Sequence, residues 1–215
     1  MPDAPAAADW SLLEPRTLPS SWCVLLIVDM VNPMRVRNSA ALRRGALAAA
    51  RQLAHLKPQL RARGLAVLYA NDNYGHWDHD FASILAACQR LRGQPGQIAR
   101  LLAPGPQDLV VLKPQHSAFH STPLEHLLKA MGTRALIIGG VASDMCVQLS
   151  ALDARMRGYH VWVPRDANAA ESPTRQQGAL RQLSLAFDCD VTPLRRMSGA
   201  ALTRQLERLD RPLDL

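Results

Sequence analysis

Three residues with side chains suited to covalent catalysis each follow a short apolar run: Asp29, Lys113 and Cys146. A thiol can attack a carbonyl carbon, and a nearby carboxylate can take up the thiol proton. A lysine supplies a compact positive charge that can pair with the carboxylate. Because Asp29 emerges from the apolar run 23–28, it must be paired, hydrogen-bonded, capping the next helix or catalytic. Complementary ionisable side chains and a cysteine at the ends of different apolar runs together suggest a functional site.

The position of Cys146 favours a reactive thiol. We expect a helix over 143–157 with Ser143 as its N-cap, which places Cys146 in the first turn, where the helix dipole lowers a cysteine pKa. The alternative is a packed cysteine, because free cysteine is among the most buried residue types. The packed interpretation is favoured for the remaining cysteines, which lie in predicted strands or a helix: Cys23, Cys88 and Cys189. No CxxC pair is present, which argues against a disulfide framework or a zinc ribbon.

Lys113 is unusual because the chain has 22 arginines and only 3 lysines. It ends an apolar run and precedes Pro114, which keeps the backbone extended. A desolvated lysine can shift its pKa, which arginine does not do usefully. The alternative is an ordinary surface lysine at the end of a strand.

The elements that must position these residues alternate between short apolar runs and longer helical stretches, which indicates βαβ units. We predict strands at 23–28, 65–70, 109–112, 135–138, 160–163 and 189–191. We predict helices at 39–63, with a kink or break at Pro58, and at 81–92, 97–102, 123–131, 143–157, 174–187 and 198–209. The expected fold class is α/β, a three-layer αβα arrangement with a six-stranded, mostly parallel, Rossmann-like sheet. Residues 1–20 are expected to be an irregular lead-in and 21–215 a single domain.

Composition excludes several functional classes. Hydrophobic residues make up 48% of the 215 residues, enough for a full core, and the net charge is +7 without a long basic run. We therefore expect no nucleic-acid partner and no membrane partner. The first ten residues lack a basic stretch followed by an apolar one, so no secretory signal is expected and the cytoplasm is the expected location.

Three segments resemble the isochorismatase-like cysteine hydrolases, which include nicotinamidases, carbamoylsarcosine amidohydrolases and ureidoacrylate amidohydrolases. They are VLLIVDMVNPM (24–34), VVLKPQHSAFHSTPLEHLL (110–128) and ALIIGGVASDMCVQLSALDARMRGYHVWVPRDANAA (135–170). The resemblance implies an Asp29–Lys113–Cys146 triad and a cis peptide between Val141 and Ala142. It also implies an oxyanion hole formed by the backbone amides of Ala142 and Cys146, and a homodimer or homotetramer.

The substrate pocket is expected to involve Phe119, which matches a pocket-lining position of the family, and Val141 in the turn. Loop position adds the residues Asn71, Asn73, Tyr74 and Trp77. The metal-binding Asp-x-His pair of nicotinamidases is missing, because Tyr74 stands at the second position, so no catalytic metal is expected. His76 and His79 are spaced for a metal on a helical turn, but a polar loop is favoured. Gly139–Gly140 lacks the third glycine of a dinucleotide fingerprint, so no organic cofactor is expected.

The sequence thus predicts a metal-independent hydrolase that cleaves an amide or ureide C–N bond of a small molecule through a covalent acyl-enzyme. The alternative is a non-catalytic small-molecule-binding or scaffold protein with the same fold. A thiol-based redox protein is a third possibility, which would need a resolving cysteine near Cys146.

Overall fold

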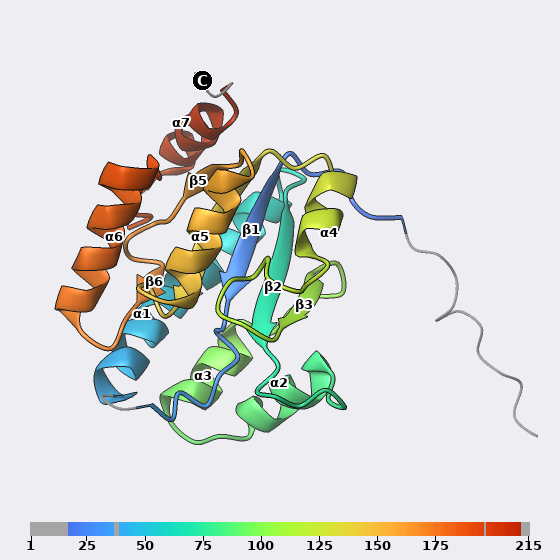
Figure 1. Ribbon diagram of the computed structural model, residues 1–215, viewed down its shortest axis with the longest axis vertical. Helices are drawn as coiled ribbons and strands as arrows, with labels where there is room; N and C mark the ends of the chain where they lie inside the picture. Colours follow the sequence, from blue (N-terminus) through green and yellow to red (C-terminus); the bar gives the residue numbers. More distant parts are fainter. Residues whose placement is uncertain (1–16, 37–38, 196, 212–215) are drawn as a thin grey trace, which may run out of the picture.

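The centre of the protein is a parallel sheet. A computed structural model describes residues 17–36, 39–195 and 197–211, so most of the expected lead-in 1–20 lies outside the described residues. The strands pair in the order β3–β2–β1–β4–β5, with β6 beside β4 (Figure 1), and every pair is parallel. They are β1 (Cys23–Val28), β2 (Ala66–Asp72), β3 (Leu109–Lys113), β4 (Ala135–Val141), β5 (His160–Trp162) and β6 (Asn168–Ala169).

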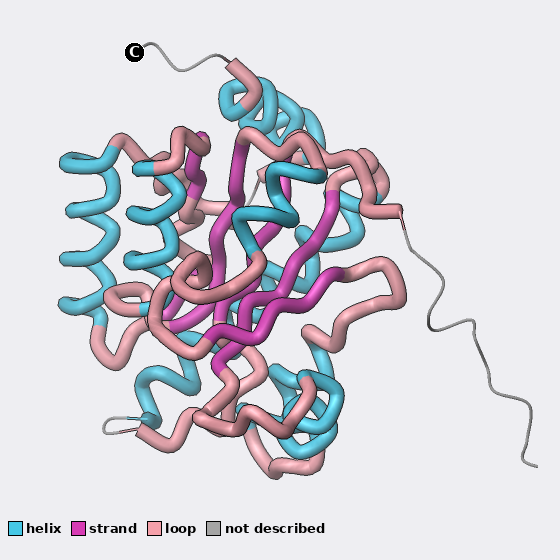
Figure 2. Tube along the Cα trace, turned by 45° about the vertical axis from the view of Figure 1, so that its right-hand side comes forward, coloured by secondary structure: helices cyan, strands magenta, loops and turns pink. Residues whose placement is uncertain are grey.

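Helices cover both faces of this sheet (Figures 1 and 2). Along β1, Cys23, Leu25 and Ile27 enter one hydrophobic cluster and their neighbours enter the other, because successive strand side chains point to opposite faces. The first cluster is closed by α1 (Ser39–Arg61), α2 (Phe81–Gln89), α3 (Gln94–Leu101) and α7 (Gly199–Leu209). The second is closed by α4 (Leu124–Ala130), α5 (Cys146–Met156) and α6 (Pro173–Phe187). The predicted αβα layering is confirmed.

The predicted sixth strand is wrong. Residues 189–191 form only an isolated bridge, between Asp190 and Trp162, and the sixth strand is instead Asn168–Ala169 beside β4. The Asp190 carboxylate accepts a hydrogen bond from the Thr192 amide at 2.7 Å, which bends the chain. Pro193 then offers no amide for further pairing.

Two helix predictions also need correction. Pro58 does not break α1 near Lys57, because the helix continues to Arg61. Pro58 lies in the last turn and leaves only the Ala54 carbonyl without its helical donor. The helix expected from Ser143 begins at Cys146, and residues 143–145 form a turn. Cys146 is therefore the first residue of α5, not the third residue after an N-cap at Ser143.

The sheet register brings four strand ends to one edge. Val28 pairs with both Ala70 and Gly140, and Asp72 pairs with Lys113. Asp29, Lys113 and the turn after β4 therefore share the carboxyl edge, where ligands bind in open parallel sheets. Among the described residues, no helix combines the length and apolar character that crossing a membrane requires.

Candidate active site

A buried ion pair lies at this edge. The Lys113 Nζ atom is 2.8 Å from the Asp29 Oδ2 atom, and both side chains are almost fully buried. The other carboxylate oxygen accepts a hydrogen bond from the Asp72 amide at 2.7 Å. Asp29 adopts φ 51°, in the left-handed region, immediately after β1. Sequence reasoning missed the contribution of the Asp72 amide, which becomes visible only when β1 and β2 are in register.

Cys146 is close to this pair. The Lys113 Nζ atom lies 3.5 Å from the Cys146 sulfur and also donates to the Gln115 carbonyl at 3.0 Å. Cys146 is partly exposed, whereas the other three cysteines are buried. The structure thus brings together the three residues that the sequence singled out, from the ends of β1 and β3 and the start of α5.

The pKa values of these groups depend mainly on burial. Burial raises the pKa of Asp29, although Lys113 opposes the shift. Burial by itself would lower the pKa of Lys113, but the charges of Asp29 and Cys146 outweigh it and hold that pKa above its usual value. Burial, followed by the Asp29 charge, raises the pKa of Cys146 to about 12, with Lys113 opposing. This direction is opposite to the lowered thiol pKa that a helix N-terminus favours, because desolvation is the largest influence on the sulfur.

The turn between β4 and α5 adds backbone groups. The peptide bond between Val141 and Ala142 is cis. Gly140 has φ 141°, and a Cβ atom there would lie 2.0 Å from the Val28 carbonyl oxygen. Glycine therefore permits β4 to pass this close to β1 directly before the turn. The Cys146 amide belongs to the first turn of α5, where backbone amides have no acceptor within the helix.

The loop residues proposed for the pocket have varied positions. Asn71 is buried and holds the backbone of Val31 through bonds of 3.1 Å to its amide and carbonyl. The Tyr74 hydroxyl donates to the same carbonyl at 3.1 Å. Asn73 is buried and closes a turn onto the Gly75 amide, whereas Trp77 is 81% exposed. Asn71 and Tyr74 therefore anchor the segment after Asp29.

Phe119 is buried in the hydrophobic cluster that α4, α5 and α6 close, 6.1 Å from the Tyr159 ring, and the Arg157 guanidinium lies 4.8 Å from its ring centre. The neighbouring Ala118 amide donates to the Ser150 hydroxyl, about one turn of α5 from Cys146. The role of Phe119 in the substrate pocket stays a prediction. Val141 is buried in the opposite cluster, at the end of β4.

Sequence reasoning also missed His116. Its Nδ1 atom lies 3.6 Å from the Cys146 sulfur, and its side chain is exposed. It borders a groove of about 310 Å³ along α5, lined by Gln115, His116, Ser117, His120, Leu149, Leu152, Asp153 and Met156. The signal in the sequence that could have identified His116 is its position three residues after the candidate catalytic lysine.

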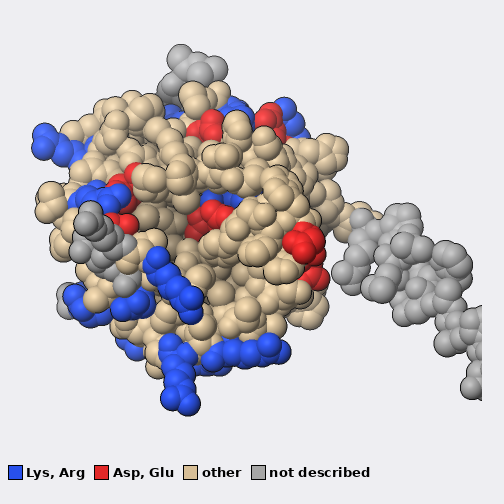
Figure 3. All heavy atoms as spheres, turned by 60° about the horizontal axis from the view of Figure 1, so that its bottom comes forward, with Lys and Arg blue, Asp and Glu red and all other residues tan. Residues whose placement is uncertain are grey.

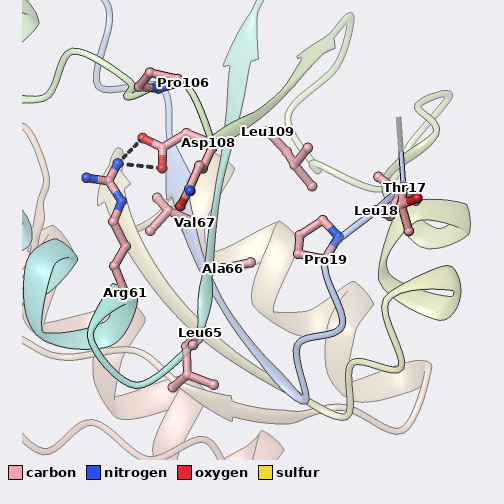
Figure 4. A pocket seen from close by; sticks show the side chains of 12 residues that line it. Thr17, Leu18, Pro19, Arg61, Leu65, Ala66, Val67, Pro106, Asp108 and Leu109 are labelled. Carbon is pink, nitrogen blue, oxygen red and sulfur yellow. Dashed lines mark hydrogen bonds and ion pairs between the residues drawn. The ribbon is translucent and has the colours of Figure 1, made fainter. Parts of the chain in front are cut away.

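Figure 3 shows the molecule from the side of the carboxyl edge, with a hollow near the middle of the surface that contains acidic and basic side chains. Another cavity, of about 450 Å³, lies at the opposite edge, beside the first residues of β2 and β3 (Figure 4). The Arg61–Asp108 ion pair closes one side of that cavity. None of the described residues that line it is a cysteine or a histidine, so the carboxyl edge is the better candidate.

Outside the Asp29–Lys113–Cys146 site, one group of described side chains could hold a metal ion. Ligand atoms of His76, Asp78 and His79 lie within 4.8 Å of one another on the loop after β2, and all three residues are exposed. The two imidazole rings stack at 4.5 Å. The two histidines that the sequence singled out are thus close together. Asp78, which the sequence did not single out, lies beside them.

Comparison with known proteins agrees with this geometry. A family model described as the isochorismatase domain matches residues 23–194. The uncharacterized isochorismatase family protein YaaI of Bacillus subtilis is 33% identical over 168 residues, covering 78% of this chain and 92% of its own. The ureidoacrylate amidohydrolase RutB of Methylorubrum extorquens is 29% identical over 203 residues, covering 81% of each chain. The structure of N-carbamoylsarcosine amidase from Thermoplasma acidophilum superimposes with a TM-score of 0.63 at 25% identity, covering 82% of this chain and 99% of that one. The chain belongs to the isochorismatase family.

Proposed function

We propose that this protein hydrolyses a C–N bond, in an amide or ureide of a small molecule, through a covalent acyl-enzyme on Cys146. The observation that carries the proposal is the position of the Lys113 ammonium, 2.8 Å from Asp29 and 3.5 Å from the Cys146 sulfur. The names of two relatives, a ureidoacrylate amidohydrolase and an N-carbamoylsarcosine amidase, support C–N cleavage.

In the first half-reaction Asp29 accepts the thiol proton while the sulfur attacks the carbonyl carbon. The raised pKa of Asp29 suits it to this exchange, because a general base works best when its pKa approaches the working pH. The amides of Ala142 and Cys146 receive the developing oxyanion. Asp29 then returns the proton to the leaving nitrogen and the C–N bond breaks, which leaves a thioester on Cys146. Lys113 holds the carboxylate in place throughout. No step requires a metal.

The test is a panel of amides and ureides, with release of the amine or ammonia as the readout. Cys146→Ala should abolish turnover of any accepted compound while the protein stays folded. Cys189→Ala is the control, because that thiol is buried near Phe187. If Cys146→Ala retains full turnover, the covalent mechanism is excluded. If the wild type turns over no member of the panel, the non-catalytic binding protein becomes the better proposal.

The redox alternative has less support. Cys23 begins β1 whereas Asp29 follows its end, so Cys23 and Cys146 belong to opposite edges of the sheet. Cys189 lies just beyond α6 and its sulfur contacts the Phe187 carbonyl. Neither is placed as a resolving partner for Cys146.

We also propose a homo-oligomer that uses the outer face of α5. Met145, Leu149 and Met156 are 36%, 40% and 73% exposed, and their spacing puts them on one side of the helix. Leu149 and Met156 line the groove that His116 borders, so a second copy seated there would cover the approach to His116.

A further inference from the structure

The starting observation is that the Cys146 sulfur has proton-handling groups on two sides. Asp29 and Lys113 lie on the inner side and are 4% and 0% exposed. His116 lies on the outer side, with its Nδ1 atom 3.6 Å from the sulfur. The groove of about 310 Å³ begins at this imidazole, so a water molecule can approach there.

The loop that carries His116 is fixed to the same helix as the nucleophile. Cys146, Ser150 and Asp153 are spaced i, i+4 and i+7 on α5 and therefore share a face. The Ser117 hydroxyl donates to the Asp153 carboxylate, and the Ala118 amide donates to the Ser150 hydroxyl at 2.9 Å. The Ser150 hydroxyl in turn donates to the Cys146 carbonyl at 2.6 Å. His116, directly before Ser117, is thus held in place relative to the sulfur.

The inner carboxylate is poorly placed for the second half-reaction. Once the sulfur is acylated, a water molecule must reach the thioester carbonyl and lose a proton. The Asp29 oxygens contact the Asp72 amide and Lys113 on the inner side of the sulfur, and Asp29 does not line the groove. With 4% exposure, Asp29 also has little contact with solvent. A base on the outer side is needed, and imidazole is the common choice for this role.

We propose that His116 is the general base that releases the acyl group from Cys146; this inference rests on the proposed function. The imidazole takes a proton from a water molecule whose oxygen attacks the thioester carbon. The C–S bond breaks, its electron pair stays on the sulfur, and the imidazolium returns the proton to the sulfur. The products are a carboxylic acid and the free thiol, so atoms and protons balance.

The experiment uses 4-nitrophenyl acetate as an acyl donor, because the natural substrate is unidentified. In the wild type we expect a burst of 4-nitrophenolate as Cys146 is acetylated, followed by slower turnover limited by thioester hydrolysis. His116→Ala should keep the burst but slow the later phase about 100-fold or more, the usual contribution of a positioned base. Added imidazole should restore the later phase in His116→Ala, whereas sodium chloride at equal ionic strength should not. His120→Ala, an exposed neighbour in the same groove, should match the wild type.

Each result has one meaning. An unchanged later phase in His116→Ala, a burst slowed as much as the later phase, or a lack of imidazole rescue overturns the role of His116. A burst that persists in Cys146→Ala, or no acetylation of the wild type at all, overturns the proposed function instead. A burst that depends on Cys146, with no effect of His116, leaves the proposed function in place and removes only this inference.

Discussion

At the Cys146 sulfur, burial and the Asp29 charge raise the thiol pKa, whereas the Lys113 ammonium lowers it. The influences that raise the pKa are larger than the one that lowers it, so Cys146 is a neutral thiol at neutral pH before it reacts. A thiol that passes its proton to Asp29 only when the carbonyl is attacked avoids placing two negative charges beside one ammonium. The low reactivity of the resting thiol is therefore compatible with catalysis.

Alkylation of Cys146 by iodoacetamide should respond in opposite directions to the loss of its two neighbours. Asp29→Asn removes an anion, so the thiol pKa should fall and alkylation near neutral pH should become faster, by about three- to fourfold for each pKa unit, because a thiolate of lower pKa is a weaker nucleophile. Lys113→Ala removes the cation, so the pKa should rise and alkylation should slow. The measurement is the alkylation rate of Cys146 from pH 6 to 10, with the buried cysteines as internal references. Equal rates in all three proteins would mean that the ion pair does not act on the sulfur.

The same ion pair should matter for stability. Lys113→Ala leaves the Asp29 carboxylate buried without its partner, and breaking a buried pair in this way costs about 3–5 kcal/mol. The mutation Lys129→Ala is a suitable control, because that lysine pairs with Glu125 on the surface of α4 and should cost about 0.5 kcal/mol or less. Urea unfolding of the two variants measures the difference. A loss below about 1 kcal/mol for Lys113→Ala would show that water reaches Asp29.

At the scale of elements, the approach of β4 to β1 sets the position of the turn before Cys146. Gly140→Ala would bring a Cβ atom against the Val28 carbonyl at an unfavourable φ. We expect a loss of about 2–5 kcal/mol in the free energy of unfolding, from overpacking and backbone strain together. Gly178→Ala, in the interior of α6 with open space around it, should instead gain about 0.5–1 kcal/mol. Equal thermal melting temperatures of the two variants would contradict this view of the turn.

Ser150 connects the loop of His116 to α5 through two hydrogen bonds. Ser150→Ala should cost about 1–3 kcal/mol in stability, because the buried Ala118 amide loses its acceptor. It should also slow deacylation by displacing His116. In a double-mutant cycle, Ser150→Ala should therefore add little further slowing when His116 is already alanine. Full additivity of the two effects on deacylation would show that Ser150 does not act through His116.

The sequence predicted most elements because their signals are local. β1 is a continuous apolar run, and its predicted bounds match the structure. β6 could not be predicted, since Asn168–Ala169 is two residues long and exists only through pairing with β4. Asp29, Lys113 and Cys146 stand at strand ends and a helix start, which sequence can locate. The placement of His116 and Phe119 depends on how the loop 114–123 folds over α5, which no periodicity reveals.

At the scale of the whole molecule, the open question is what covers α5. The outer face of this helix is apolar where it borders the candidate site, although the chain carries a net charge of +7. A charge of this size opposes self-association over long range, so contact between copies must come from apolar burial. The association is then expected to strengthen with salt, because salt screens the repulsion.

Sedimentation velocity at micromolar concentration should show a homodimer or homotetramer, and Met156→Glu should shift it toward the monomer. Met156 is 73% exposed, and a buried carboxylate at an apolar contact is costly unless it finds a partner. Leu185→Glu is a matched control, because Leu185 is equally exposed, at 73%, but lies on α6. If the site depends on a second copy for closure, Met156→Glu should also raise KM at unchanged protein stability, whereas Leu185→Glu should not. A wild type that remains monomeric at all concentrations, or a Leu185→Glu variant that dissociates as readily as Met156→Glu, would contradict an interface on the outer face of α5. In the monomeric case the groove beside His116 would be an open entrance to the site.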